Sequence, residues 1–288
     1  MRDSYQGFRV LLVHAHPDDE TINNGATMAM YAALGASVTL VTCTRGEEGE
    51  VLIPELSHLA ANATDSLGHH RVTELALAMK ELGVADHRFL GEGAKLFRDS
   101  GMMGTDPNNR PDVFWQADIE EASDLLVQTI DEVKPHVLIT YDEFGGYGHP
   151  DHIQAHRVAM RAAEKSAWDI PKIYWNVMPI SVIQEGIDAM KGIDSDFWGA
   201  EKAEDLPFAK DDSFVHALVD GNAYVEKKMS AMRAHATQIA VDGPFFALSN
   251  NVGLQVWGNE YYTLVKGEKS GPFNEKGYES DLFAGISL

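Results

Sequence analysis

The sequence predicts an α/β fold with a Rossmann-like, doubly wound and mostly parallel sheet. Short apolar runs alternate with longer segments of helical composition along most of the chain, which is typical of such sheets. The chain has 288 residues, of which 44% are hydrophobic, so it is long enough to bury a sizeable core. Polar clusters directly follow two of the apolar runs, which indicates where a site would form.

The apolar runs predict the strands of this sheet. The first run, FRVLLVH, is short, mostly apolar and rich in strand-forming residues, which favours a buried parallel strand. In chain order, strands are predicted over residues 8–14, 37–44, 87–91, 136–142, 172–178 and 260–266.

Helices are predicted between these runs. Gly35 and Gly83 follow the first two, as expected because glycine commonly ends a helix. Pro150 suits a first helical position, since no N–H needs a partner there. The predicted helices cover residues 24–34, 56–82, 113–133, 150–167 and 222–238.

The alternation of strands and helices changes after about residue 171. We expect a Rossmann-like metal-binding catalytic domain over residues 1–170 and a smaller C-terminal portion over 171–288 that completes the substrate pocket. Residues 95–109 are rich in Gly, Asp, Asn and Pro and are interpreted as a loop. Residues 186–212 are acidic and are interpreted as an irregular insertion.

Charge and cysteine content exclude several classes of function. With 23 Lys and Arg against 44 Asp and Glu, the net charge is -21, which repels phosphate backbones and anionic lipid. We therefore expect neither a nucleic-acid partner nor a membrane partner. Cys43 is the one cysteine, so a disulfide within the chain and a cysteine zinc cluster are excluded, and we expect it buried in a strand. The N-terminus lacks the pattern of a signal peptide, so a cytoplasmic location is expected.

Two polar motifs predict a metal site. HAHPDDE, residues 14–20, follows the first strand, and GGYGHPDH, residues 145–152, follows the fourth. Because ligands bind outside the carboxyl ends of strands in open α/β sheets, both motifs are expected to face one crevice. His16, Asp19 and His152 then supply a common catalytic zinc set, which also suits Fe(II) and leaves a position open for water or substrate. One divalent ion per chain is expected.

Side chains beside these ligands are candidates for the chemistry of hydrolysis. A metal lowers the pKa of a water molecule, and Asp18 is a candidate to take that proton and deliver it to a leaving amine. His149 is a candidate to stabilise an oxyanion, and Asp151 to orient a histidine. Tyr147, on a glycine-rich loop, is a candidate donor to the substrate carbonyl. The structural alternative is that the acidic group only stabilises a helix start.

Other motifs and histidines provide weaker evidence. No G-x-G-x-x-G follows the first strand, and no P-loop, HExxH or G-x-S-x-G occurs, so a dinucleotide site and these catalytic classes are not supported. His14 and His235 are expected to be structural, and for His235 the alternative is that it lines the pocket.

At HAHPDDE and GYGHPDH the chain resembles the LmbE-like (PIG-L) metal-dependent N-acetylglucosamine deacetylases, and the resemblance extends over most of the chain. Segments similar to the mycothiol-pathway branch of the family are DDETINNGAT, TCTRGEEGEV, FRDSGMMGT, YDEFGGYGHPDH, AHATQ and ALSNN. The resemblance implies that the three ligands hold Zn or Fe(II). It also implies that Asp18 is the general base and acid, and that Tyr147 polarises the acetyl carbonyl. His149 would stabilise the tetrahedral intermediate, with Asp151 behind it.

The resemblance further implies a substrate. Arg71, Asp99, Glu50 and Met102 match positions that line the sugar and inositol pocket in that branch, and composition and spacing alone do not select them. The implied reaction is hydrolysis of the N-acetyl group of GlcNAc-inositol to GlcN-inositol and acetate in mycothiol biosynthesis. Two alternatives stay open: an amidase acting on mycothiol S-conjugates, which shares the metal motif, and a non-catalytic metal-dependent sugar-binding module.

Overall fold

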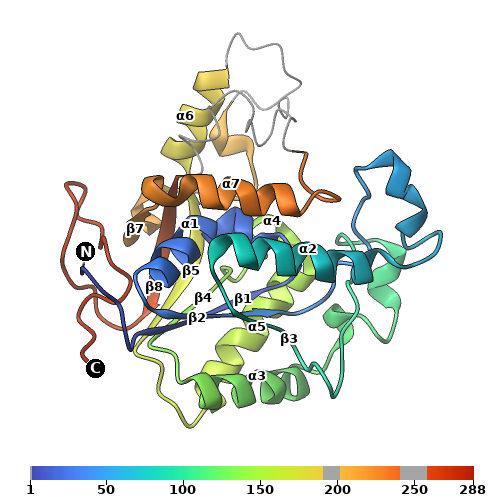
Figure 1. Cartoon of the computed structure of the whole chain (residues 1–288), viewed down its shortest axis with the longest axis horizontal. Helices are drawn as coiled ribbons and strands as arrows, with labels where there is room; N and C mark the ends of the chain where they lie inside the picture. Colours follow the sequence, from blue (N-terminus) through green and yellow to red (C-terminus); the bar gives the residue numbers. More distant parts are fainter. Residues whose placement is uncertain (1, 191–201, 241–257) are drawn as a thin grey trace.

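An eight-stranded, mostly parallel sheet forms the centre of the computed structural model, which describes residues 2–190, 202–240 and 258–288 (Figure 1). Its strands are β1 Arg9–His14, β2 Ser37–Thr42, β3 Asp86–Phe89, β4 Val137–Thr140, β5 Lys172–Pro179, β6 Ala209–Lys210, β7 Ala217–Asp220 and β8 Asn259–Lys266. The strand order is β3-β2-β1-β4-β5-β8-β7, with β6 paired to β5 outside this path. The pairs from β3 to β5 are parallel, whereas β8 is antiparallel to both neighbours, β5 and β7. The predicted fold class is therefore confirmed.

Helices cover both faces of the sheet. They are α1 Asp19–Ala33, α2 Leu67–Leu82, α3 Ile119–Val133, α4 Gly145–Gly148, α5 Pro150–Lys165, α6 Ile180–Met190 and α7 Val225–Ala234. Figure 1 shows α1, α2 and α7 on one side of the sheet and α3 and α5 on the other. Within the described part of the chain, no helix is long and apolar enough to cross a membrane.

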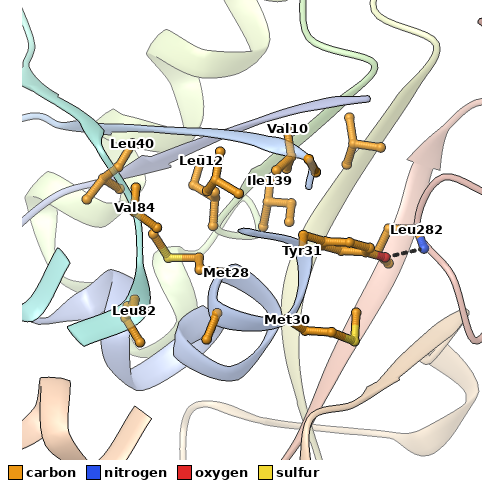
Figure 2. Packing of buried hydrophobic residues seen from close by; sticks show 14 of the residues in the cluster. Val10, Leu12, Met28, Met30, Tyr31, Leu40, Leu82, Val84, Ile139 and Leu282 are labelled. Atoms are coloured by element: carbon orange, nitrogen blue, oxygen red, sulfur yellow. Dashed lines mark hydrogen bonds between the residues drawn. The ribbon is translucent and has the colours of Figure 1, made fainter. Parts of the chain in front are cut away.

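Alternate residues of β1 enter two separate cores, because neighbouring side chains of a strand point to opposite faces. Val10 and Leu12 pack with Met28 of α1 and other residues on the α1–α2–α7 side (Figure 2). Leu11 and Val13 pack on the α3–α5 side. A strand buried on both faces is continuously apolar, which is why the first run was recognisable.

The largest error in the predicted helices lies between residues 56 and 82. A short 3-10 helix covers Pro54–Leu59, and α2 begins only at Leu67. Between them Asp65 has a φ of 52°, which a continuous helix does not allow, and the Thr64 hydroxyl donates to the His58 carbonyl. Local side-chain hydrogen bonding therefore ended the helix where composition alone suggested that it continued.

Other element boundaries also differ from the predictions. The helix expected over 24–34 begins at Asp19, the one expected over 113–133 begins as an α-helix at Ile119, and the one expected over 222–238 ends at Ala234. Strands β6 and β7 and helix α6 were not predicted, and residues 186–190 of the expected irregular insertion belong to α6. Of the expected irregular insertion, residues 191–201 lie outside the described residues, and so does the ALSNN segment. Cys43 is buried directly after β2.

The strand order produces a switch point beside β1. The chain passes from β1 to β2 and β3 on one side, whereas β4 and β5 lie on the other side. Ligands of open α/β sheets bind where the order reverses, at the carboxyl ends of the strands. Both polar motifs lie there, because one follows β1 and the other follows its parallel neighbour β4. Strands β8 and β7 extend the same sheet, and a domain division after residue 170 stays a prediction.

Candidate active site

A cavity of about 770 Å³ lies at the carboxyl ends of β1 and β4. Every predicted site residue except Asp151 lines it, namely His16, Asp18, Asp19, Glu50, Arg71, Asp99, Met102, Tyr147, His149 and His152. Asp151 is fully buried next to His152. The tertiary structure thus brings together residues that are far apart in the sequence.

The three predicted metal ligands meet at one carboxylate oxygen. His16 Nδ1 lies 3.3 Å from Asp19 Oδ2, and His152 Nε2 lies 3.4 Å from the same atom. Ligand atoms of a tetrahedral zinc site lie about 3.3–3.4 Å apart, given metal–ligand distances of about 2.0–2.1 Å. His152 Nδ1 lies 3.1 Å from the Gly145 carbonyl, so it carries the proton, and Nε2 is a buried atom without a hydrogen bond. These residues therefore fit a divalent metal.

The charge around the ligands also favours a cation. Burial raises the pKa of Asp19, but the rings of His152 and His16 outweigh burial and hold it well below its usual value. Burial lowers the pKa of His16, but Asp99, Asp151 and Asp19 outweigh burial and raise it well above its usual value. A pocket that stabilises positive charge on an imidazole also stabilises a metal ion in place of the proton.

The carboxylate of Asp151 supports His16. Asp151 Oδ2 lies 3.1 Å from His16 Nε2 and accepts the Ser100 N–H at 2.9 Å, while the Ser100 hydroxyl donates to Oδ1. The resemblance placed Asp151 behind His149, but the structure links those two through the backbone, because the Asp151 N–H donates to His149 Nδ1. The side chain of Asp151 thus contacts His16, one of the predicted ligands, and not His149. Such supporting carboxylates fix the tautomer and orientation of a ligating histidine.

His149 offers a second way to complete a ligand set. One nitrogen each of His16, His149 and His152 lie within 4.8 Å of one another. His149 also caps α5 by accepting the Asp151 N–H on Nδ1. That contact leaves Nε2 as the protonated nitrogen of the neutral ring. Burial, aided by the charges of His16 and His152, lowers the pKa of His149 to about 2, so a neutral donor is favoured over a cation.

Asp18 occupies an unusual backbone conformation at the start of α1. Its φ is 128°, in a region that residues other than glycine rarely adopt. Burial raises the pKa of its carboxyl to about 6, although the Arg71 guanidinium opposes this shift. A carboxyl group with a raised pKa beside a metal site is suited to accept and release a proton near neutral pH.

Arg71 holds the turn that carries Asp18. It is buried on α2, and its Nη2 lies 3.2 Å from Asp18 Oδ2 and donates to the Pro17 carbonyl. Its Nη1 donates to the Gly46 carbonyl at 2.9 Å. Arg71 was expected only as a substrate-binding residue. The structure adds a contact with Asp18 that its spacing in the sequence could not indicate.

The other predicted substrate residues occupy different depths of the cavity. Asp99 is buried, lies 3.5 Å from His16 Nε2 and accepts the Glu48 and Gly101 N–H groups. Met102 is 51% exposed. Tyr147, predicted as a donor to the substrate carbonyl, is 43% exposed, and its ring lies 4.9 Å from that of His152. Glu50 is also exposed.

Sequence reasoning missed several polar side chains of the cavity wall. These are Asn23, Glu48, Asp142, Asn176, Lys210 and Gln238. Gln238 belongs to the AHATQ segment, whose similarity to the family was the one signal that marked it. The expectation that His14 is structural is confirmed, because it is fully buried between Asn24 Oδ1 and the Tyr141 hydroxyl.

Comparisons with known sequences found a matching family and relatives that align with nearly the whole chain. The family model described as GlcNAc-PI de-N-acetylase (PIG-L) matches residues 11–163. The chain is 58% identical over 293 residues to 1D-myo-inositol 2-acetamido-2-deoxy-alpha-D-glucopyranoside deacetylase 1 of Catenulispora acidiphila, covering 97% of this chain and 90% of that protein. It is 58% identical over 291 residues to the deacetylase of the same substrate name from Geodermatophilus obscurus, covering 96% and 98%.

Solved structures share the fold at low sequence identity. N,N'-diacetylchitobiose deacetylase from Pyrococcus horikoshii matches with a TM-score of 0.56 and 19% identity, over 90% of this chain and 84% of that one. The 4-carboxy-2-hydroxymuconate hydratase GalB from Pseudomonas putida matches with a TM-score of 0.57 and 17% identity, over 93% and 100%. These two enzymes are named for different reactions, so the fold alone does not specify the chemistry. The extent of the sequence match does specify the family: the chain belongs to the GlcNAc-PI de-N-acetylase (PIG-L) family.

Proposed function

We propose that this protein hydrolyses the N-acetyl group of 1D-myo-inositol 2-acetamido-2-deoxy-α-D-glucopyranoside, releasing the free amine and acetate, as a step of mycothiol biosynthesis. The observation that carries the proposal is the convergence of His16 Nδ1 and His152 Nε2 on one oxygen of Asp19, beside the carboxylate of Asp18. The choice of substrate follows the relatives, which are 54–58% identical over nearly the whole chain.

We propose zinc as the ion, with Fe(II) as the alternative, held by His16, Asp19 and His152. When bound, a divalent ion there would polarise the acetyl oxygen and lower the pKa of a water molecule. Asp151 would keep His16 Nε2 protonated and its Nδ1 free to bind, since the carboxylate lies 3.1 Å from Nε2.

The side chains of the cavity would carry the proton transfers. Asp18 would accept a proton from the attacking water and deliver it to the amine as the C–N bond breaks, so that water and amide become acetate and amine. His149 Nε2–H would donate to the developing oxyanion, and the Tyr147 hydroxyl would donate to the acetyl oxygen. Both side chains line the same cavity as Asp18.

The remaining cavity residues would bind the sugar and inositol. Arg71 and Asp99 lie deep in the cavity, whereas Glu50 and Met102 are exposed on its wall. This arrangement would place the acetamide at the ligands and the inositol toward the exposed end.

Release of primary amine tests the proposal directly. Protein loaded with Zn(II), or with Fe(II) under anaerobic conditions, is incubated with the substrate, and metal content is measured on the same sample. We expect one ion per chain and amine release that stops on chelation. Absence of amine above the blank, with metal bound, would contradict the proposal.

Two variants and a second substrate separate the alternatives. Asp18→Asn should lower kcat by about 10²–10⁴-fold while metal and sugar binding persist, because a general base contributes about that much. Asp112→Asn is the matched control, since Asp112 pairs with Arg110 on the surface. Full turnover by Asp18→Asn would refute the role of Asp18. An amidase would show the higher kcat/KM on a mycothiol S-conjugate, and a binding module would show no turnover by the wild type.

A further inference from the structure

Two buried carboxylates connect helix α1 to the segment that contains α7. Glu260, on β8, accepts the backbone N–H groups of Ala26 and Thr27 at 2.9 and 2.8 Å and lies 2.7 Å from Lys228 Nζ. Glu20, in the first turn of α1, lies 2.9 Å from Nε2 of His235, the residue that follows α7. The first pair contacts the middle of α1, and the second contacts its start.

Glu20 contacts the backbone of Asp18 as well as His235. Its Oε2 accepts the Asp18 N–H at 2.9 Å, and its Oε1 faces His235 Nε2. The carboxylate therefore bridges His235 to the amide of Asp18. Glu20 and His235 are both fully buried, so water does not compete for these contacts.

The conformation of Asp18 requires such restraints. A φ of 128° is costly for a residue with a side chain, and a costly conformation persists only where its surroundings hold it. The Asp18 carbonyl accepts the Ile22 N–H at 2.9 Å, the Asp18 carboxylate contacts Arg71, and the Asp18 N–H contacts Glu20. Removing the last contact would free the turn to relax and would redirect the carboxylate.

The segment after α7 is itself firmly anchored. Thr237 donates through its N–H and its hydroxyl to the two oxygens of Glu74 at 2.8 and 2.7 Å. Glu74 lies on α2, three residues after Arg71. The Gln238 amide donates to the Glu50 carbonyl at 2.9 Å. The segment 235–238 thus contacts the start of α1 through Glu20, helix α2 through Glu74 and the cavity wall through Glu50.

We propose that Glu20 and His235 are positioning residues that set the direction of the Asp18 carboxylate without touching the substrate. Of the residues that the structure describes, the cavity wall includes neither of them. The proposal rests on the function proposed above, in which Asp18 moves the protons. Under this proposal, the contact between Glu20 and His235, which lie 215 residues apart in the chain, affects the rate of catalysis.

Steady-state kinetics on the metal-loaded full chain test this assignment. We expect His235→Ala to lower kcat by about 10–100-fold with KM within about threefold and one ion still bound, because a misplaced proton acceptor affects turnover. His235→Gln, whose amide can donate to Glu20, should recover kcat to within about fivefold of wild type. Glu20→Gln should lower kcat as His235→Ala does, and it preserves the buried volume if the alanine variant fails to fold.

Glu260→Gln is the matched control. It weakens the other buried pair that contacts α1, Glu260 with Lys228, so it should lower the Tm while kcat stays within about twofold of wild type. An equal loss of kcat in Glu260→Gln and His235→Ala would overturn the proposal, because it would indicate general destabilisation of α1.

A double-mutant cycle gives the decisive result. If His235 acts through Asp18, adding His235→Ala to Asp18→Asn should lower the residual rate by less than about twofold, since the two effects are not independent. Multiplicative losses would overturn the proposal, as would wild-type kcat in His235→Ala. An inactive wild type with metal bound would instead refute the proposed function.

Discussion

Replacing Gly46 by alanine should disable the site by displacing Arg71. A Cβ at Gly46 would lie 2.0 Å from Arg71 Nη1, whereas ordinary contact begins at 3.4 Å. The guanidinium must therefore retreat by about 1.4 Å, the difference between these distances. That retreat breaks its 3.2 Å contact with Asp18 Oδ2 and its hydrogen bond to the Gly46 carbonyl. A displacement of about 1 Å in a catalytic arrangement can lower the reaction rate by about 100-fold, so we expect kcat/KM to fall by about that factor.

Gly83→Ala separates this clash from the backbone cost. Gly83 has a φ of 77° and Gly46 a φ of 67°, but a Cβ at Gly83 would meet nothing within 4 Å. Both variants should lose about 1–2 kcal/mol of stability from placing a side chain in the left-handed region. Urea unfolding measures that loss, and amine release measures kcat/KM. Gly83→Ala should keep kcat/KM within about twofold of wild type. Equal kcat/KM in the two variants would refute the role given to Arg71.

Three further outcomes follow from the same geometry. Asp19→Ala should abolish metal binding in elemental analysis, whereas His149→Ala should retain the ion and lose turnover; the reverse result would make His149 a ligand. Asp151→Asn should weaken metal binding by about 10–100-fold in competition with a chelator, because it removes the charged support of a ligating histidine. Tyr31→Phe should lower the free energy of unfolding by about 1–3 kcal/mol in urea, with kcat unchanged. The Tyr31 hydroxyl accepts the Leu282 N–H at 2.9 Å in the core, and phenylalanine would leave that N–H unpaired (Figure 2).

The strands were predictable because their signal is local. The middle of the β1 run, Val10–Val13, is apolar at every position since both faces of the strand are buried, and no distant information is needed to recognise it. Strand β7, Ala217–Asp220, has only four residues and is buried on one face, so it lacks the continuous apolar run that marks the equally short β4. The break between residues 59 and 67 escaped prediction because it depends on hydrogen bonds of particular side chains.

The predicted metal ligands and the side chains around them also differ in how far the sequence could predict them. Two predicted ligands, His16 and Asp19, lie within one turn directly after the first strand, so their spacing and position indicated a site. The contact of Asp151 with His16 was not predictable, since four carboxylates and four histidines of the two motifs offered several pairings. Arg71 carried no chemical signal on its helix, and family resemblance alone selected it.

The sequence by itself predicted the fold class, a set of three candidate metal ligands and a candidate proton acceptor, because each depends on residue types within a short stretch and on the rule that strand ends face one edge of a sheet. Only the tertiary structure decided which side chains contact the candidate proton acceptor. Asp18 meets Arg71 of α2, and its amide meets a carboxylate fixed by His235 after α7. Those contacts join segments on three different helices, and their pairing depends on how the helices pack across one face of the sheet, which no local pattern records.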